Sequence, residues 1–84
     1  MRFRKKPVEI DAVYYDGVNQ EEIRRFLNGD RVGGVLHKNG EKIVIDTLEG
    51  SMSTGPGTWI IRGIHGEYYP CQHDIFLKSY ESVE

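Results

Sequence analysis

Turn signals interrupt this sequence at short intervals, and their spacing limits every regular element to a few residues. Glycine turns recur along most of the chain: Asp16-Gly17, Asn28-Gly29, Asn39-Gly40, Glu49-Gly50, Gly55-Pro56-Gly57 and Gly63 to Gly66. The segments between them are rich in β-branched and aromatic residues, which favours short strands. We therefore expect a single α+β domain over residues 1–84, with a small, strongly curved and mostly antiparallel sheet.

Two segments are predicted to be helical. Asn19 followed by Glu22 resembles a capping box, and apolar residues at helical spacing then predict a short helix over residues 20–28. Asn28-Gly29 supplies its end. Near the other end of the chain, Asp74 is placed to cap a helical turn near residues 74–78.

The remaining segments are predicted to be strands. Residues 7–15 alternate apolar and polar side chains, and residues 32–37 and 42–47 flank an Asn39-Gly40 hairpin turn. Further strands are expected at 51–53, 59–62 and 67–70, and residues 79–83 are expected to close the sheet as an edge strand.

The charge distribution bears on the kind of partner. The first six residues carry four positive charges, and the other 78 carry seven bases and thirteen acids, a net of −6. Such an acidic body argues against binding to long nucleic acids, whereas a local basic edge suits a small anion. The alternative is a merely solvated charge cluster. No apolar run approaches the roughly 20 residues of a membrane helix, so no membrane partner is expected.

Catalytic and metal-binding patterns are weak. Cys71 and His73 have no second ligand pair at zinc-finger spacing, and no glycine-rich phosphate loop precedes a helix. One cysteine cannot form an intrachain disulfide, which fits the cytoplasm. We expect no enzyme activity, no metal and no cofactor.

A binding role is the stronger prediction, and it rests on residues 51–69. This stretch combines hydroxyl groups, aromatic rings and Arg62 around glycines. Aromatic rings stack on bases, and arginine donates paired hydrogen bonds to phosphate. The alternative is that Trp59 and one tyrosine belong to the core and Arg62 is solvated. Because neighbouring strand residues point to opposite faces, only one of Tyr68 and Tyr69 can be a core residue.

The sequence also resembles a widespread group of small phage and prophage proteins. The resemblance is carried by the opening RKKPVEIDA, the central PGTWIIRG, and the later GEYYPC, DIF and SYE, about half of the chain. The chain departs from that group at Thr58 and His65. It resembles in particular the anti-CBASS sponges, short phage proteins that sequester nucleotide signals of bacterial defence.

The resemblance implies a homo-oligomer in the cytoplasm of an infected bacterial host. It would bind a cyclic dinucleotide or an ADP-ribose-type signal without cleaving it. On this hypothesis the ligand-binding residues are Arg4 and Arg62 for phosphate, Trp59 and Tyr68 for stacking, and Thr54 and His65 for base or sugar edges. The alternative is a phage structural, morphogenesis or host-protein-binding component with no small ligand, because curved sheets with exposed edges assemble readily.

Overall fold

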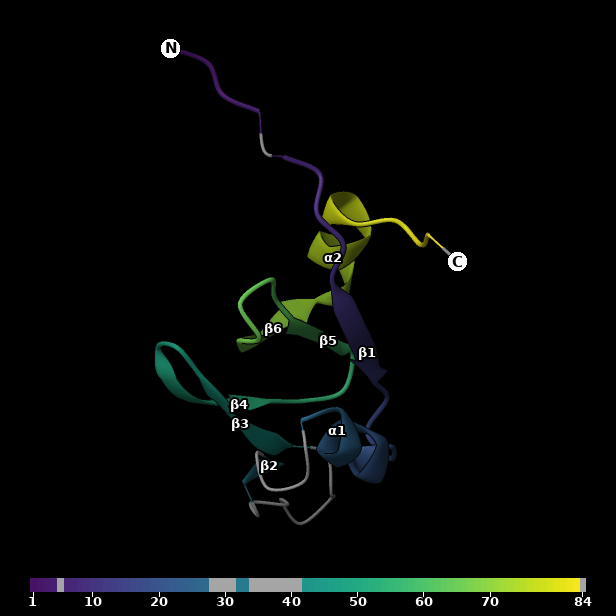
Figure 1. Ribbon diagram of the computed structural model, residues 1–84. Helices are drawn as coiled ribbons and strands as arrows, with labels where there is room; N and C mark the ends of the chain where they lie inside the picture. Colours follow the sequence, from purple (N-terminus) through teal and green to yellow (C-terminus); the bar gives the residue numbers. More distant parts are fainter. Residues whose placement is uncertain (5, 28–31, 34–41, 84) are drawn as a thin grey trace.

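The computed structural model describes residues 1–4, 6–27, 32–33 and 42–83. Its element order is β1 (Asp11–Tyr15), α1 (Gln20–Phe26), β2 (Val32–Gly33), β3 (Ile43–Thr47), β4 (Gly50–Thr54), β5 (Thr58–Arg62), β6 (Tyr68–Gln72) and α2 (His73–Ser79). The α+β class and the antiparallel pairing are confirmed. The strands are divided between two three-stranded sheets, β1-β5-β6 and β2-β3-β4 (Figure 1).

The strand predicted over residues 7–15 is shorter than expected. β1 begins at Asp11 because its register against β5 ends there, with Asp11 opposite Arg62. The chain leaves β5 at Gly63, whose amide bonds the carbonyl of Glu67 to close the next turn. No residues of β5 therefore remain for residues 7–10 to pair with.

α1 carries the predicted apolar stripe but begins differently. Ile23 and Leu27 are fully buried, as the helical spacing indicated. The capping box does not form, because the Asn19 side chain makes no cap hydrogen bond. Its amide instead donates to the carbonyl of Tyr14 and to Glu22, fastening the turn that joins β1 to α1. The predicted stop at Asn28-Gly29 lies outside the described residues.

The described strands of the second sheet pair antiparallel, as the sequence predicted; residues 34–37 of the predicted strand over 32–37 lie outside the described residues. β2 and β3 pair antiparallel, although the Asn39-Gly40 turn between them lies outside the described residues. β3 and β4 pair with Thr47 opposite Gly50, so the expected strand at 51–53 extends by one residue at each end. β3 also lies against β6, which brings the two sheets together.

The end of the chain differs from the prediction. α2 spans His73–Ser79, longer than the expected turn, and residues 80–83 form no strand. Two contacts hold the chain on the helix instead: the Ser79 hydroxyl donates to the carbonyl of Ile75, and the Tyr80 ring packs 5.0 Å from that of Phe76. The edge-strand prediction for 79–83 is wrong because this spacing of four residues is helical.

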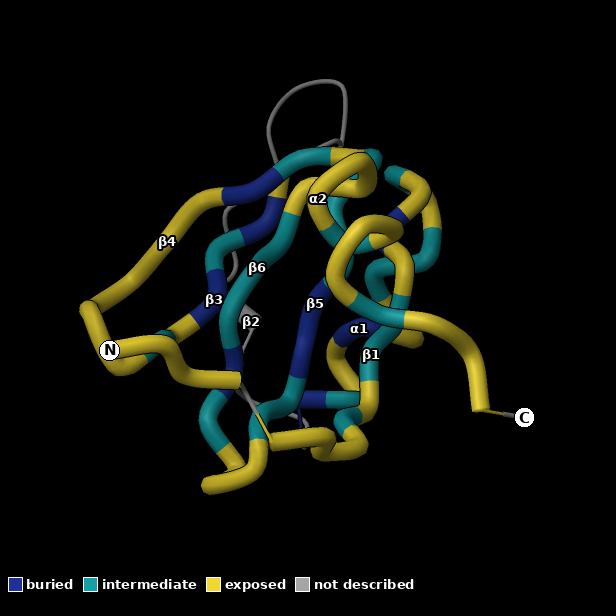
Figure 2. Tube along the Cα trace, turned by 90° about the horizontal axis from the view of Figure 1, so that it is seen from above, coloured by how far each residue is buried: buried dark blue, intermediate teal, exposed yellow. Residues whose placement is uncertain are grey.

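The core lies between the sheets and α1. Its buried members are Tyr15, Ile23, Leu27, Ile43, Ile45, Ile60 and Tyr68. They come from α1, its C-cap residue Leu27 and four strands, and burial is concentrated in the centre of the molecule (Figure 2). Within the described ranges, neither helix is long and apolar enough to cross a membrane.

Candidate functional site

β5 divides the predicted binding residues between two environments. Its side chains alternate, so Ile60 and Arg62 face α1 and the core, whereas Trp59 and Ile61 face α2. Ile60 belongs to the core cluster, and Trp59 stacks on a ring of α2. Trp59 and Arg62 are therefore on opposite faces of the sheet and cannot contact one ligand within one chain.

Trp59 is the centre of an aromatic cluster on the α2 face. Its ring is nearly parallel to that of Phe76, with centroids 4.1 Å apart and an interplanar angle of 8°. The indole nitrogen donates a 3.0 Å hydrogen bond to Nδ1 of His73, and Tyr14 meets the indole edge-on at 5.3 Å. These contacts hold α2 against the sheet while leaving Trp59 only half-buried.

A groove of about 910 Å³ opens beside this cluster. We call it the α2 groove. Its walls are residues 7–10, residues 80–83 and α2 itself. It is lined by Pro7, Val8, Glu9, Ile10, Ala12, Trp59, Phe76, Leu77, Ser79, Tyr80, Glu81, Ser82 and Val83. Most of these side chains are apolar, and the charged members are the two glutamates.

Arg62 is engaged on the other face. Its guanidinium donates a 2.7 Å hydrogen bond to Oδ2 of Asp11 and lies 5.3 Å from the centroid of the Phe26 ring. The hydrogen bond to Asp11, followed by that to Tyr68, raises the pKa of Arg62. A carboxylate in contact offsets the charge that a phosphate would need, so this residue fits a structural ion pair better than a phosphate site.

The two adjacent tyrosines point to opposite faces, as predicted. Tyr68 is 5% exposed, and its hydroxyl donates to the carbonyl of Phe26 at the end of α1. Tyr69 points the other way, and its hydroxyl oxygen lies 3.5 Å from that of Tyr80. Burial, together with the Tyr80 hydroxyl, raises the pKa of Tyr69 to about 12. Tyr68 is a core residue and is not free to stack on a ligand.

The other three predicted residues lie apart from the groove. Thr54 is buried at the end of β4, and His65 is exposed in the turn between β5 and β6. Arg4 is exposed on the segment before β1. Of the six predicted residues the structure brings Arg62 and Tyr68 together, as cross-strand partners, and places Trp59 alone in the α2 groove.

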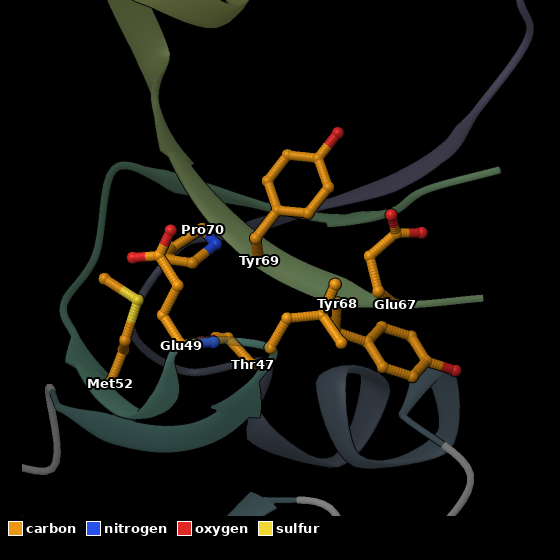
Figure 3. A pocket seen from close by; sticks show the side chains of 8 residues that line it. Thr47, Glu49, Met52, Glu67, Tyr68, Tyr69 and Pro70 are labelled. Atoms are coloured by element: carbon orange, nitrogen blue, oxygen red, sulfur yellow. The ribbon is translucent and has the colours of Figure 1, made fainter. Parts of the chain in front are cut away.

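A smaller hollow lies where β6 meets the β3–β4 turn (Figure 3). It measures about 350 Å³, and Glu49 and Glu67 are among its lining residues. The Glu67 carboxylate already accepts the backbone amide of His65. Two carboxylates repel phosphate, so this hollow does not suit a nucleotide.

Sequence reasoning missed the residues that build the groove. Phe76, Leu77 and Tyr80 come from α2 and its continuation, part of which was predicted to be a strand. The four-residue spacing of Phe76 and Tyr80 was the available signal. Among the described residues, no group of three or more His, Cys, Asp or Glu side chains is arranged to hold a metal ion.

No family model matches this chain, and no match was found among curated proteins or solved structures.

Proposed function

We propose that this protein is a non-enzymatic interaction protein that binds an extended polypeptide segment in the α2 groove. The observation that carries the proposal is the accessible apolar surface at this groove. Leu77 is 60% exposed and Val83 is 71% exposed, beside the half-buried ring of Trp59. Contiguous exposed apolar surface of this kind marks interaction sites.

The shape of the groove supports an extended occupant. Residues 7–10 and 80–83 line it without belonging to any strand, and a peptide that binds between such segments commonly does so in an extended form. Specificity would come from alternate side chains entering between Trp59 and Leu77. The class of function is that of an assembly or partner-binding component, and with the phage resemblance we place it in the cytoplasm of an infected bacterium.

A peptide selection tests the proposal. We expect a displayed library panned on the full chain to yield extended peptides with alternating apolar residues. Their binding should change the fluorescence of Trp59, the single tryptophan. Leu77→Glu should weaken binding at least tenfold, because a buried leucine contributes about 1.5–3 kcal/mol.

The matched control lies on the same helix. Ile75 is 52% exposed but does not line the groove, so Ile75→Glu should leave peptide affinity within about twofold of wild type. The groove would be ruled out as the binding site if Leu77→Glu and Ile75→Glu lowered peptide affinity equally. It would also be ruled out if Leu77→Glu left the affinity of every selected peptide unchanged.

A second candidate is the sequestration of a nucleotide signal, and the aromatic floor of the groove favours it. The rings of Trp59 and Phe76, which form this floor, stack on each other, and a base would extend that stack. Arg62 is held by Asp11, so cations for the phosphates would come from Arg2 and Arg4, which form no ion pair within the described part of the chain. A second copy would bring them to the groove.

Calorimetric titration separates the two candidates. Cyclic dinucleotides and cyclic ADP-ribose compounds should release heat on binding to wild type and bind at least tenfold more weakly to Trp59→Leu, because a base stack contributes about 1–3 kcal/mol. Chromatography of the recovered ligand should show it intact. No heat across the whole panel would reject the nucleotide candidate and leave polypeptide binding.

A further inference from the structure

Residues 1–4 form an exposed segment with an unusual mixture of side chains. We call it the N-terminal arm. It extends away from the body, which gives the molecule a long dimension of 48 Å against 25 Å and 22 Å for the other two (Figure 1). Phe3 is 88% exposed, and Met1 is exposed completely. Two large apolar side chains at this exposure bury almost no surface within their own chain.

The pattern of the arm complements the α2 groove. In an extended segment, Met1 and Phe3 lie on one side, and Arg2 and Arg4 lie on the other. The groove offers the matching arrangement, with an aromatic floor and two exposed acids, Glu9 and Glu81, among its lining residues. No other charged side chain lines the groove in the described part of the chain.

We propose that the occupant of the α2 groove is the N-terminal arm of a second copy of this chain, exchanged reciprocally in a twofold dimer. This inference rests on the proposed function, that the groove binds an extended polypeptide. In the dimer, Phe3 of each copy packs on the aromatic floor of the other, and Arg2 and Arg4 face Glu9 and Glu81.

The path of the chain favours exchange over insertion of the arm into its own groove. Pro7 and Val8 already form part of the groove wall, so the arm leaves from the edge of the groove. Pro7 also restricts Lys6 to extended backbone, which continues the arm outward. In a twofold dimer, the arm of each copy would follow this outward path into the groove of the other copy, so the two contacts are equivalent.

The buried area predicts a weak dimer. An aromatic side chain buries about 150–250 Å². Two copies of Phe3 and Met1, with the groove surface that they cover, bury on the order of 1,200 Å², the lower limit of specific interfaces. We therefore expect a dimer that forms at micromolar concentrations and dissociates on dilution.

Sedimentation equilibrium of the full chain over a concentration series tests the exchange. Wild type should change from monomer to dimer, and Phe3→Ser and Leu77→Glu should each raise the dissociation constant at least tenfold. The matched control is Ile64→Ser, because Ile64 is 62% exposed but lies in the turn between β5 and β6. The dissociation constant of the Ile64→Ser dimer should stay within about twofold of the wild-type value.

Charge reversal provides a test that does not depend on the stability of one variant. Arg2→Glu with Arg4→Glu should abolish the dimer, and so should Glu9→Lys with Glu81→Lys. In a mixed dimer of these two double variants, the acidic arm enters the basic groove and the basic arm enters the acidic groove. An equimolar mixture should therefore form a dimer, although each variant alone stays monomeric. The quadruple variant carries both reversals in every chain and should regain the dimer.

Each contrary outcome has a defined meaning. A wild type that stays monomeric, or a dimer that is insensitive to Phe3→Ser, overturns the exchange. A dimer that needs Phe3 but ignores Leu77→Glu also overturns it, since the arm then docks elsewhere. If peptides selected on the groove still bind a monomeric wild type, polypeptide binding stands while the exchange fails; if no peptide binds either, both fail.

Discussion

The indole N–H of Trp59 donates a hydrogen bond to Nδ1 of His73, joining the second residue of β5 to the first residue of α2. The same two rings are nearly parallel, with centroids 6.3 Å apart. α2 has no fully buried residue, so contacts of this kind fix its position on the sheet. The floor of the α2 groove depends on that position.

Replacing His73 by alanine should therefore loosen α2. We expect His73→Ala to lower the free energy of unfolding by about 1 kcal/mol, the net value of a hydrogen bond, and to change the emission of Trp59. Urea titration followed by fluorescence measures both effects. His65→Ala replaces an exposed turn histidine and should change stability by less than about 0.5 kcal/mol; equal effects from the two substitutions would contradict the role of His73.

Tyr68 should behave as a core residue in spite of its place in the predicted binding segment. Tyr68→Phe removes the hydrogen bond to the carbonyl of Phe26 and should lower the free energy of unfolding by about 1 kcal/mol. Tyr68→Ala removes a buried ring from the core and should lower the free energy of unfolding by about 3–5 kcal/mol. Thermal or urea unfolding measures both. Tyr69→Ala should cost less than Tyr68→Ala, since Tyr69 is only partly buried, and the reverse order would show that the two rings are exchanged.

The Arg62–Asp11 pair should show a coupling that salt removes. Both side chains are accessible to water, so the attraction is modest and screened. In a double-mutant cycle, Arg62→Ala and Asp11→Ala should each lower the melting temperature slightly, and the double variant should lower it by less than the sum. The coupling should disappear in concentrated sodium chloride. Coupling that persists there would point to a more deeply desolvated pair.

Gly17 should not tolerate a side chain. Its backbone has φ of +97°, and a Cβ there would lie 3.1 Å from Cγ of Pro56. Gly17→Ala should lower the free energy of unfolding by about 1–2 kcal/mol through the left-handed backbone alone. Gly55→Ala is the matched control, because the nearest atom to its Cβ lies 4.0 Å away. This control should be neutral or stabilising by about 0.5 kcal/mol in a urea titration; a similar loss in both would reject the strain argument.

Alkaline pH should destabilise the fold through Tyr69. Its pKa is raised from 10.0 to about 12 in the native state, because burial favours the neutral phenol. The native state thus binds the proton more tightly, so this contribution is complete below pH 10 and is lost as the pH rises toward 12. Ultraviolet difference absorbance follows the ionisation. Tyr69→Phe should remove the step near pH 12, and Tyr80→Phe should lower the pKa only in part, because burial is the larger cause.

The alternation of side chains along a strand predicted how some residues of the binding segment are oriented. Tyr68 and Tyr69 had to point to opposite faces, and they do. The same rule separates Trp59 from Arg62, which are three residues apart, but the predicted site placed both against one ligand. The pairing of Arg62 with Asp11 joins residues 51 positions apart, and no local pattern encodes such a contact.

The sequence alone determined the α+β class, the apolar stripe of α1 and the hairpin from β3 to β4, because backbone periodicity and turn chemistry act over a few neighbouring residues. Tertiary structure decided how the strands divide between two sheets and which tyrosine enters the core. It also decided that residues 7–10 and the segment after α2 line one groove. These outcomes depend on which distant surfaces bury each other, and that choice is made by packing the whole chain at once.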